Sequence, residues 1–282
     1  MYKNILLCTD GSPTADNAAA HAVALAGKLR ARITALYVTD IRVLEGPLLS
    51  DISGALGAQT YNALLPQLEQ IQREKADALL QAVKKRCADA QIECAVAHET
   101  GTLIHKMLDY ERKADLVVLG RQGENAKWLE DALGSSVERM VRASVKPCLV
   151  TPGQFRPIEH ILLAHDGSAE STKALRAGIG LAGDLGVGVT IITVCQKEGE
   201  EAAATKILKD AQQQAAAAKL SVHGELGHGH AESEILRVCE EVGAELIVMG
   251  AYGHTRIREL VLGSTTSQVL TESHVPVLLF RG

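Results

Sequence analysis

A chain of 282 residues has room for about two domains, and its 46% hydrophobic and 22% charged residues are typical of a globular protein. It has no apolar run of about 18 residues, which argues against a transmembrane helix. A net charge of −5 without a basic block argues against nucleic acid or an anionic membrane as the main partner.

The N-terminal sequence MYKNILLCTD leads directly into a strand-like segment, so we expect neither a signal peptide nor a membrane span here. Six cysteines are scattered along the chain without a C-x-x-C pair, and several fall inside apolar runs, which predicts small buried thiols. Such thiols fit a reducing cytoplasm, the location that we expect.

The sequence repeats itself with an offset of 156 residues, because Lys3–Ser12 matches Glu159–Ser168. In both copies an apolar run ends at Asp-Gly-Ser, which predicts a strand followed directly by a capped helix. We expect the helices at 13–30 and 169–185, and second strands at 31–38 and 187–195.

The two copies then diverge. Residues 39–60 form a long segment with several glycines, followed by a charged helix over 63–88, whereas the second copy passes almost directly into a helix over 198–219. A segment of this length inside a compact domain is typically a lid, a partner contact or disordered.

Three further strands are expected in each half, at 92–98, 115–119 and 147–151 and at 221–226, 245–249 and 276–280. A linker over 152–157 separates the halves, so we expect domains at 1–152 and 157–282. Strand and helix alternate five times in each, which predicts an α/β fold with two open, parallel, five-stranded sheets covered by helices on both faces.

The segment after the fourth strand of the second half is typical of a phosphate site. Its residues are Gly250, Gly253, Gly263, Ser264 and Thr265. Glycines let backbone approach a bulky anion, and amides and hydroxyls at a helix start can point at phosphate oxygens. Two tight turns and a helix start would explain the same glycines without a ligand.

The spacing G-x2-G-x9-G-S/T resembles the nucleotide-binding signature of the universal stress protein family, in its ATP-binding branch. Two such domains in one chain correspond to the tandem form of that family, and the resemblance covers the whole chain. It implies a Rossmann-like sheet order 3-2-1-4-5, as in the adenine nucleotide alpha hydrolases. Ligands of such sheets bind at the carboxyl ends of the strands where the order reverses, here between the first and fourth strands.

The resemblance also implies residue roles in the second half. Asp166 would contact the ribose of ATP, and the backbone of Val194 would hold the adenine edge. The five residues of the phosphate segment would surround the phosphates, with Mg²⁺ as an optional companion. A plain helix cap is the alternative for Asp166, and core packing is the alternative for Val194.

The first half has a degenerate version of this motif, with ten residues instead of nine before its last glycine. Its intervening loop is acidic, carrying Glu124, Glu130 and Asp131 against Lys127, whereas the loop of the second half carries Arg256 and Arg258 against Glu259. We therefore expect the first half to bind ATP weakly or not at all, with another small ligand under residues 39–60 as a further option. The residues of this weaker site are Asp10, Val38, Gly120, Gly123, Gly134, Ser135 and Ser136.

Two other patterns carry less weight. Residues 178–183 spell G-x-G-x-x-G but fall inside an expected helix instead of after a strand. This favours close helix–sheet packing or the end of that helix over a dinucleotide site. His223, His228 and His230 lie close together in sequence, but no cysteine or carboxylate pattern completes a metal site, so we expect no metal.

The leading interpretation is a cytoplasmic, ATP-binding regulatory or protective module. A slow ATPase or phosphate-transfer enzyme is the alternative, although Asp166 is its one evident general base. A flavin-binding relative with the same sheet order is a third reading. By analogy with dimers of single-domain family members, we expect the two halves to pack through their fifth strands as an intramolecular pseudo-dimer, and a homodimer of chains is a further option.

Overall fold

The computed structural model of this chain describes residues 2–41, 58–123, 133–197, 199–251 and 262–281. The strands of the N-terminal half are β1 (Asn4–Cys8), β2 (Arg32–Asp40), β3 (Cys94–Gly101), β4 (Leu116–Gly120) and β5 (Cys148–Thr151). Those of the C-terminal half are β6 (His160–Ala164), β7 (Gly188–Cys195), β8 (Val222–His228), β9 (Leu246–Gly250) and β10 (Val277–Phe280).

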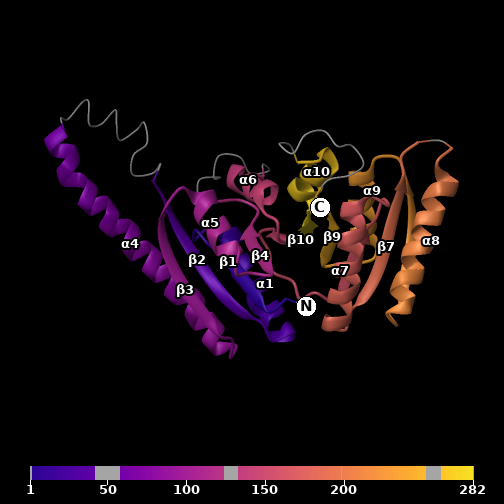
Figure 1. Cartoon of the computed structure of the whole chain (residues 1–282), viewed down its shortest axis with the longest axis horizontal. Helices are drawn as coiled ribbons and strands as arrows, with labels where there is room; N and C mark the ends of the chain where they lie inside the picture. Colours follow the sequence, from indigo (N-terminus) through magenta and orange to yellow (C-terminus); the bar gives the residue numbers. More distant parts are fainter. Residues whose placement is uncertain (1, 42–57, 124–132, 198, 252–261, 282) are drawn as a thin grey trace.

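Helices follow the strands in each half. They are α1 (Pro13–Leu29), α4 (Ala58–Asp89), α5 (Leu103–Glu111) and α6 (Ser135–Ala143) in the first half. In the second half they are α7 (Ala169–Leu185), α8 (Glu201–Ala217), α9 (Ala231–Glu241) and α10 (Ser264–Glu272). The long α4 runs beside β3 at the outer edge of the N-terminal half (Figure 1).

The described strands form one continuous sheet in the order β3-β2-β1-β4-β5-β10-β9-β6-β7-β8. Each half therefore has the expected order 3-2-1-4-5, and the Rossmann-like fold class is confirmed. The expectation of two separate sheets is corrected, because β5 and β10 pair with each other and join the two halves edge to edge. This pairing is antiparallel, whereas the other described strand pairs are parallel.

Local sequence explains where the first helix of each half begins. Ser12 caps α1 by accepting a hydrogen bond of 3.2 Å from the amide of Ala15, and Ser168 caps α7 in the same way, at 3.2 Å from the amide of Ser171. Helix α7 ends at Leu185, and the next residue, Gly186, has a left-handed φ of 69° that suits glycine. The two Asp-Gly-Ser motifs therefore mark equivalent strand-to-helix turns, as expected.

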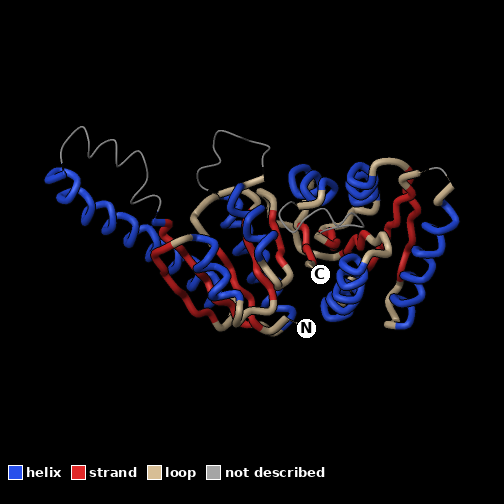
Figure 2. The backbone as a smooth tube through the Cα atoms, turned by 45° about the horizontal axis from the view of Figure 1, so that its top comes forward, coloured by secondary structure: helices blue, strands red, loops and turns tan. Residues whose placement is uncertain are grey.

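Helices cover both faces of the sheet (Figure 2). Alternating side chains of β1 belong to two cores. Ile5 and Leu7 lie in the core on the sheet face covered by α1, α4, α7 and α8, whereas Leu6 and Cys8 lie in the core on the face covered by α5, α6, α9 and α10. Both faces of the central strands are buried, which is why these strands are continuous apolar runs.

Arginines reinforce the junction between the halves. Arg121, just after β4, donates to the carbonyls of Thr271 at 2.7 Å and Ser273 at 2.9 Å, at the C-terminal end of α10. Arg281, just after β10, donates to the carbonyl of Arg142 in α6. Cations at helix C-termini are favourable because the carbonyls there lack helical partners. The expected packing through the fifth strands is confirmed.

A buried histidine lies where the linker crosses α1. His21 is 1% exposed, its ring packs against Phe155 with centroids 4.8 Å apart, and its Nε2 has no hydrogen-bond partner among the described residues. Burial lowers the pKa of His21 to about 4, and a backbone contact with Gln154 opposes this shift.

We expect His21 to make the fold sensitive to acid. The unfolded chain binds a proton near pH 6.5 and the folded chain only near pH 4, so stability falls as pH drops through this window. Over the whole window the free energy of unfolding falls by about 3 kcal/mol. Urea unfolding at pH 7.5 and pH 4.5 should show a smaller loss for His21→Leu than for the wild type. The exposed His105→Leu serves as the control, and equal pH dependence of both variants would refute the assignment to His21.

Candidate functional site

A cavity of about 860 Å³ opens at the carboxyl ends of β1, β2 and β4. This is the point where the strand order of the N-terminal half reverses. The weaker predicted site lines it in full: Asp10, Val38, Gly120, Gly123, Gly134, Ser135 and Ser136. We call this cavity the N-terminal crevice. The structure thus brings together residues that are far apart in the sequence.

Hydrogen bonds fix the walls of the N-terminal crevice. The amide of Ser12 donates to Oδ1 of Asp10 at 2.9 Å, and the hydroxyls of Ser12 and Thr14 both donate to the carbonyl of Gln122. These contacts tie the start of α1 to the loop after β4. The amide of Gly134 then donates to the carbonyl of Arg121 at 3.1 Å, which places the start of α6 beside the same loop.

Gly120 is required by close packing. A Cβ at this position would lie 2.5 Å from the backbone carbon of Thr14 and 2.7 Å from the amide nitrogen of Ala15. At Gly123, a Cβ would lie 3.0 Å from Oδ2 of Asp10, inside the crevice. The first glycine thus lets strand and helix meet, and the second keeps space beside the carboxylate.

Sequence reasoning missed two cations that line the N-terminal crevice. They are Lys75 of α4 and Arg139 of α6. Arg139 is folded back over the first turn of its helix, where Nε donates to the carbonyl of Ser135 at 3.1 Å and Nη2 to the hydroxyl of Ser136 at 3.4 Å. The sequence could have indicated Arg139, because a residue four positions after Ser135 lies on the same face of the helix. Lys75 is remote in sequence, and only the packing of α4 brings it here.

The C-terminal half repeats these elements. Asp166 accepts a hydrogen bond of 2.9 Å from the amide of Ser168, Gly250 ends β9, and Gly263 is the residue before α10. The hydroxyl of Thr266 donates to the carbonyl of Ala251 at 3.1 Å and joins the start of α10 to the end of β9.

Three further residues of the predicted C-terminal site take equivalent places. Val194 is half-buried on β7, and Ser264 and Thr265 begin α10. Gly253, Arg256, Arg258 and Glu259 lie outside the described residues, as do Glu124, Lys127, Glu130 and Asp131 of the first half. The loops on which the expected charge difference between the halves depends are therefore not described.

A carboxylate that the sequence did not single out lies beside the C-terminal phosphate segment. The hydroxyl of Thr265 donates to Oε2 of Glu232 at 3.3 Å, and Glu232 belongs to the first turn of α9. A carboxylate here repels a bare phosphate at short range. It can instead share a cation with one, since carboxylate, hydroxyl and phosphate oxygens are all ligands that Mg²⁺ accepts.

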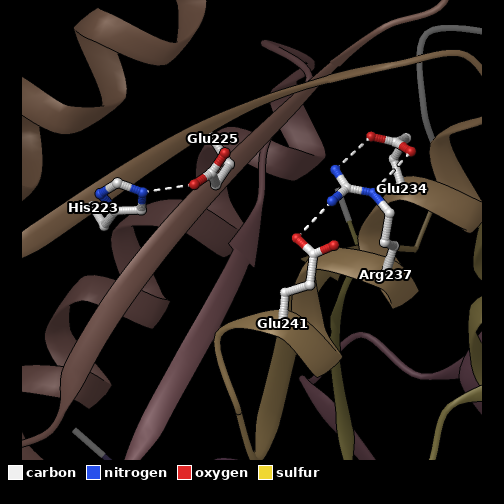
Figure 3. A network of polar contacts seen from close by, with 5 residues as sticks. All are labelled: His223, Glu225, Glu234, Arg237 and Glu241. Carbon is white, nitrogen blue, oxygen red and sulfur yellow. Dashed lines mark hydrogen bonds and ion pairs between the residues drawn. The ribbon is translucent and has the colours of Figure 1, made fainter.

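His223, His228 and His230, the three histidines that lie close together in sequence, each approach a different carboxylate. His223 lies 2.6 Å from Glu225, as Figure 3 shows beside the separate contacts of Arg237 with Glu234 and Glu241 on α9. His228 lies 4.0 Å from Glu201, and His230 lies 3.7 Å from Glu232. Among the described residues no group of three or more His, Cys, Asp or Glu side chains could hold a metal.

The G-x-G-x-x-G pattern lies within α7, and a Cβ at Gly178 would overlap the side chain of Leu163 in β6. The interpretation of this glycine as a site of close helix–sheet packing is confirmed. In the described part of the chain, no helix combines the length and the apolar character needed to cross a bilayer.

Comparison with known proteins identifies the family. Residues 1–152 and 157–281 each match the universal stress protein family. The chain is 42% identical over 289 residues to the universal stress protein Slr1230 of Synechocystis sp., covering 99% of this chain and 100% of the relative. It is 30% identical over 148 residues to YxiE of Bacillus subtilis, covering 43% of this chain and 97% of that protein.

A solved structure supports the fold. The universal stress protein of Archaeoglobus fulgidus superposes with a TM-score of 0.72 at 21% identity, covering 99% of this chain and 98% of the other. Both halves match the family, and Slr1230 is similar over its full length. The chain therefore belongs to the universal stress protein family.

Proposed function

We propose that this chain binds ATP in its C-terminal half and acts as a regulatory or protective module in the stress response. One observation carries the proposal. The N-terminal copy of the motif encloses a cavity of about 860 Å³, within the size range of cofactor sites, and the C-terminal half repeats the same elements. The C-terminal copy also has the nine-residue spacing of the family signature.

The positions of the predicted residues that the structure describes support the roles proposed for them. Asp166, at the end of β6, would accept hydrogen bonds from ribose hydroxyls, and the backbone of Val194 would contact the adenine edge. Gly250, Gly253, Gly263, Ser264 and Thr265 would surround the phosphates. Backbone amides at the start of α10 suit such an anion because they have no partners within the helix.

Mg²⁺ would allow the Glu232 carboxylate and the phosphates of ATP to lie close together. Thr265 and Glu232 would supply oxygen ligands, and the phosphates would supply the others. The cation would replace the repulsion between carboxylate and phosphate by attraction to both. We further propose that 1–152 and 157–282 are the two domains and that the protein is cytoplasmic, which the six free thiols support.

Matched glycine variants test the proposal. We expect Gly263→Val to lower ATP affinity at least about 100-fold, because its side chain would occupy the space of the phosphates. The equivalent Gly134→Val in the N-terminal crevice should leave affinity within about twofold. Titration calorimetry measures both. Tight ATP binding that survives Gly263→Val and is lost in Gly134→Val would contradict the assignment to the C-terminal half.

A slow ATPase is the second candidate, and the Glu232 carboxylate beside the phosphate segment is the observation that favours it. Either Glu232 or Asp166 could accept a proton from an attacking water. Phosphate release that disappears in Asp166→Ala or Glu232→Gln while ATP binding persists would support turnover. The absence of release above the uncatalysed background would leave ATP as a bound regulator.

A further inference from the structure

We propose that Cys94 is a thiol that reacts with hydroperoxides and that Cys87 then forms a disulfide with it. The two cysteines lie far from the N-terminal crevice, because Cys94 begins β3 whereas the crevice lies at the carboxyl ends of the parallel strands. The inference goes beyond ATP binding in the C-terminal half and does not depend on it.

The fold brings the two cysteines together at the outer edge of the sheet. Cys87 lies in the last turn of α4, and Cys94 is the first residue of β3, the edge strand of this half. The amide of Ile92 donates to the carbonyl of Cys87 at 2.8 Å, and the amide of Ile33 in β2 donates to the carbonyl of Glu93 at 2.9 Å. These two bonds fix the turn at both ends. Across it, the side chains of Cys87 and Cys94 are hydrogen-bonded to each other.

The two thiols differ in exposure, and this difference assigns their roles. Cys87 is 0% exposed and belongs to the core under α4, whereas Cys94 is half-buried and packs against the edge of that core. A small hydroperoxide in solution therefore reaches Cys94 first. Cys87 lies directly behind it, where it can react only with Cys94.

Local electrostatics favour the same assignment. The hydrogen bond with Cys87 lowers the pKa of the Cys94 thiol, and the charge of Lys84, about one turn before Cys87 on α4, adds to this effect against the opposing effect of burial. The same hydrogen bond, together with burial, raises the pKa of Cys87. Because the thiolate is the form that attacks a peroxide, Cys94 is the nucleophile of the pair.

The C-terminal half builds the same turn without thiols. The amide of Leu220 donates to the carbonyl of Ala215 at 3.3 Å, so Ala215 takes the place of Cys87. With the same spacing along the chain, Val222 begins β8 as Cys94 begins β3. Alanine and valine can therefore pack this turn, and packing alone does not require cysteine at either position.

Two steps convert the pair to a disulfide. The Cys94 thiolate attacks the terminal oxygen of a hydroperoxide, ROOH. An S–O bond forms, the O–O bond breaks, and RO⁻ leaves and takes a proton from water, so Cys94 becomes a sulfenic acid. Cys87 then loses its proton, and its sulfur attacks the sulfur of Cys94. The S–S bond forms as the S–O bond breaks, and the hydroxide leaves as water with that proton.

The electrons balance in this sequence. The two thiols together lose two electrons, and the hydroperoxide gains them to give an alcohol and a water molecule. A small external dithiol reverses the change by thiol–disulfide exchange, and is itself oxidised to a disulfide. The pair can therefore cycle between its two states.

Peptide mapping of the full chain tests the proposal. The wild type is treated with an equimolar amount of hydrogen peroxide, and the remaining thiols are alkylated after denaturation. Trypsin leaves both cysteines in one peptide, 87–106. We expect this peptide to escape alkylation and to weigh about 2 Da less than its reduced form, because each thiol loses one hydrogen atom. Cleavage after Glu93 should leave two peptides joined by the disulfide.

The other cysteines provide an internal control. Burial raises the pKa of three of them, so they should react at least about tenfold more slowly and be recovered alkylated. These are Cys8, Cys148 and Cys239.

Two variants that copy the C-terminal half separate the roles of the pair. Cys87→Ala should stop at the sulfenic acid on Cys94, which dimedone traps as an adduct. Cys94→Val should leave Cys87 as an unmodified thiol at the same peroxide concentration. Cys239→Ala removes a buried thiol elsewhere and should form the disulfide like the wild type.

The outcomes decide the proposal in either direction. A disulfide between Cys87 and Cys94 in the wild type, with a dimedone adduct on Cys94 in Cys87→Ala, supports it. Full alkylation of both thiols in the treated wild type overturns it, as does a dimedone adduct on Cys87 in Cys94→Val. If a variant fails to fold, the peptide map of the wild type decides. A failure of ATP binding would leave these results unchanged, so the two proposals fail separately.

Discussion

Gly120→Ala should destabilise the protein by about 3 kcal/mol, a large effect for the addition of one methyl group. The new Cβ would lie 2.5 Å from the backbone carbon of Thr14 and 2.7 Å from the amide nitrogen of Ala15. Both are backbone atoms of α1, so relief requires the helix to move away from β4. The same movement would open the N-terminal crevice at its base. Urea unfolding followed by circular dichroism measures the change.

Gly27→Ala is the matched control, because it makes the same chemical change on α1, the helix that Gly120 of β4 contacts. A Cβ at Gly27 meets no atom within 4 Å, and alanine is the better helix former. This variant should therefore stabilise the protein by about 0.5–1 kcal/mol. If the two variants unfold at the same urea concentration, close packing is not the reason for glycine at position 120.

Leu278→Asp should abolish cooperative folding. Leu278 is 1% exposed and pairs with Leu149 across the antiparallel junction of β10 and β5. A carboxylate there would be buried in an apolar core without a cation or hydrogen-bond donor, at a cost of more than about 4 kcal/mol. Because these strands join the halves, we expect both halves to be affected, which urea unfolding and the yield of soluble protein would show.

The control places the same charge on the surface near the junction. Val145 is 78% exposed, so Val145→Asp should change stability by less than about 0.5 kcal/mol. A folded Leu278→Asp protein with the wild-type unfolding midpoint would mean that the β5–β10 junction does not support the fold.

Much of the fold follows from local pattern. Continuous apolar runs mark the central strands, and the two Asp-Gly-Ser motifs mark where α1 and α7 begin. Strand ends are less predictable because pairing decides them. The third strand, expected over 92–98, is Cys94–Gly101, because the amide of Ile92 bonds to the carbonyl of Cys87 in the turn after α4. At its other end the strand continues because Gly101 pairs with Asp40 of β2.

The candidate site was predictable only in part. Residues near the glycine motifs were found, since the motif itself places them at a helix start. Lys75 and Glu232 were missed, because each comes to lie beside a glycine motif through the packing of a helix that carries no motif. The junction between the halves was anticipated from the family resemblance and not from strand patterns, since periodicity does not say which sheet edges meet.

The most direct test of the central proposal is to locate bound ATP on the wild-type chain. A photoreactive adenine nucleotide would be cross-linked at low occupancy, with excess ATP as competitor, and the labelled peptides identified by mass spectrometry. We expect the competed label in residues 157–282, near the ends of β6 and β7. Competed label confined to residues 1–152, or no competed label on either half, would contradict ATP binding in the C-terminal half.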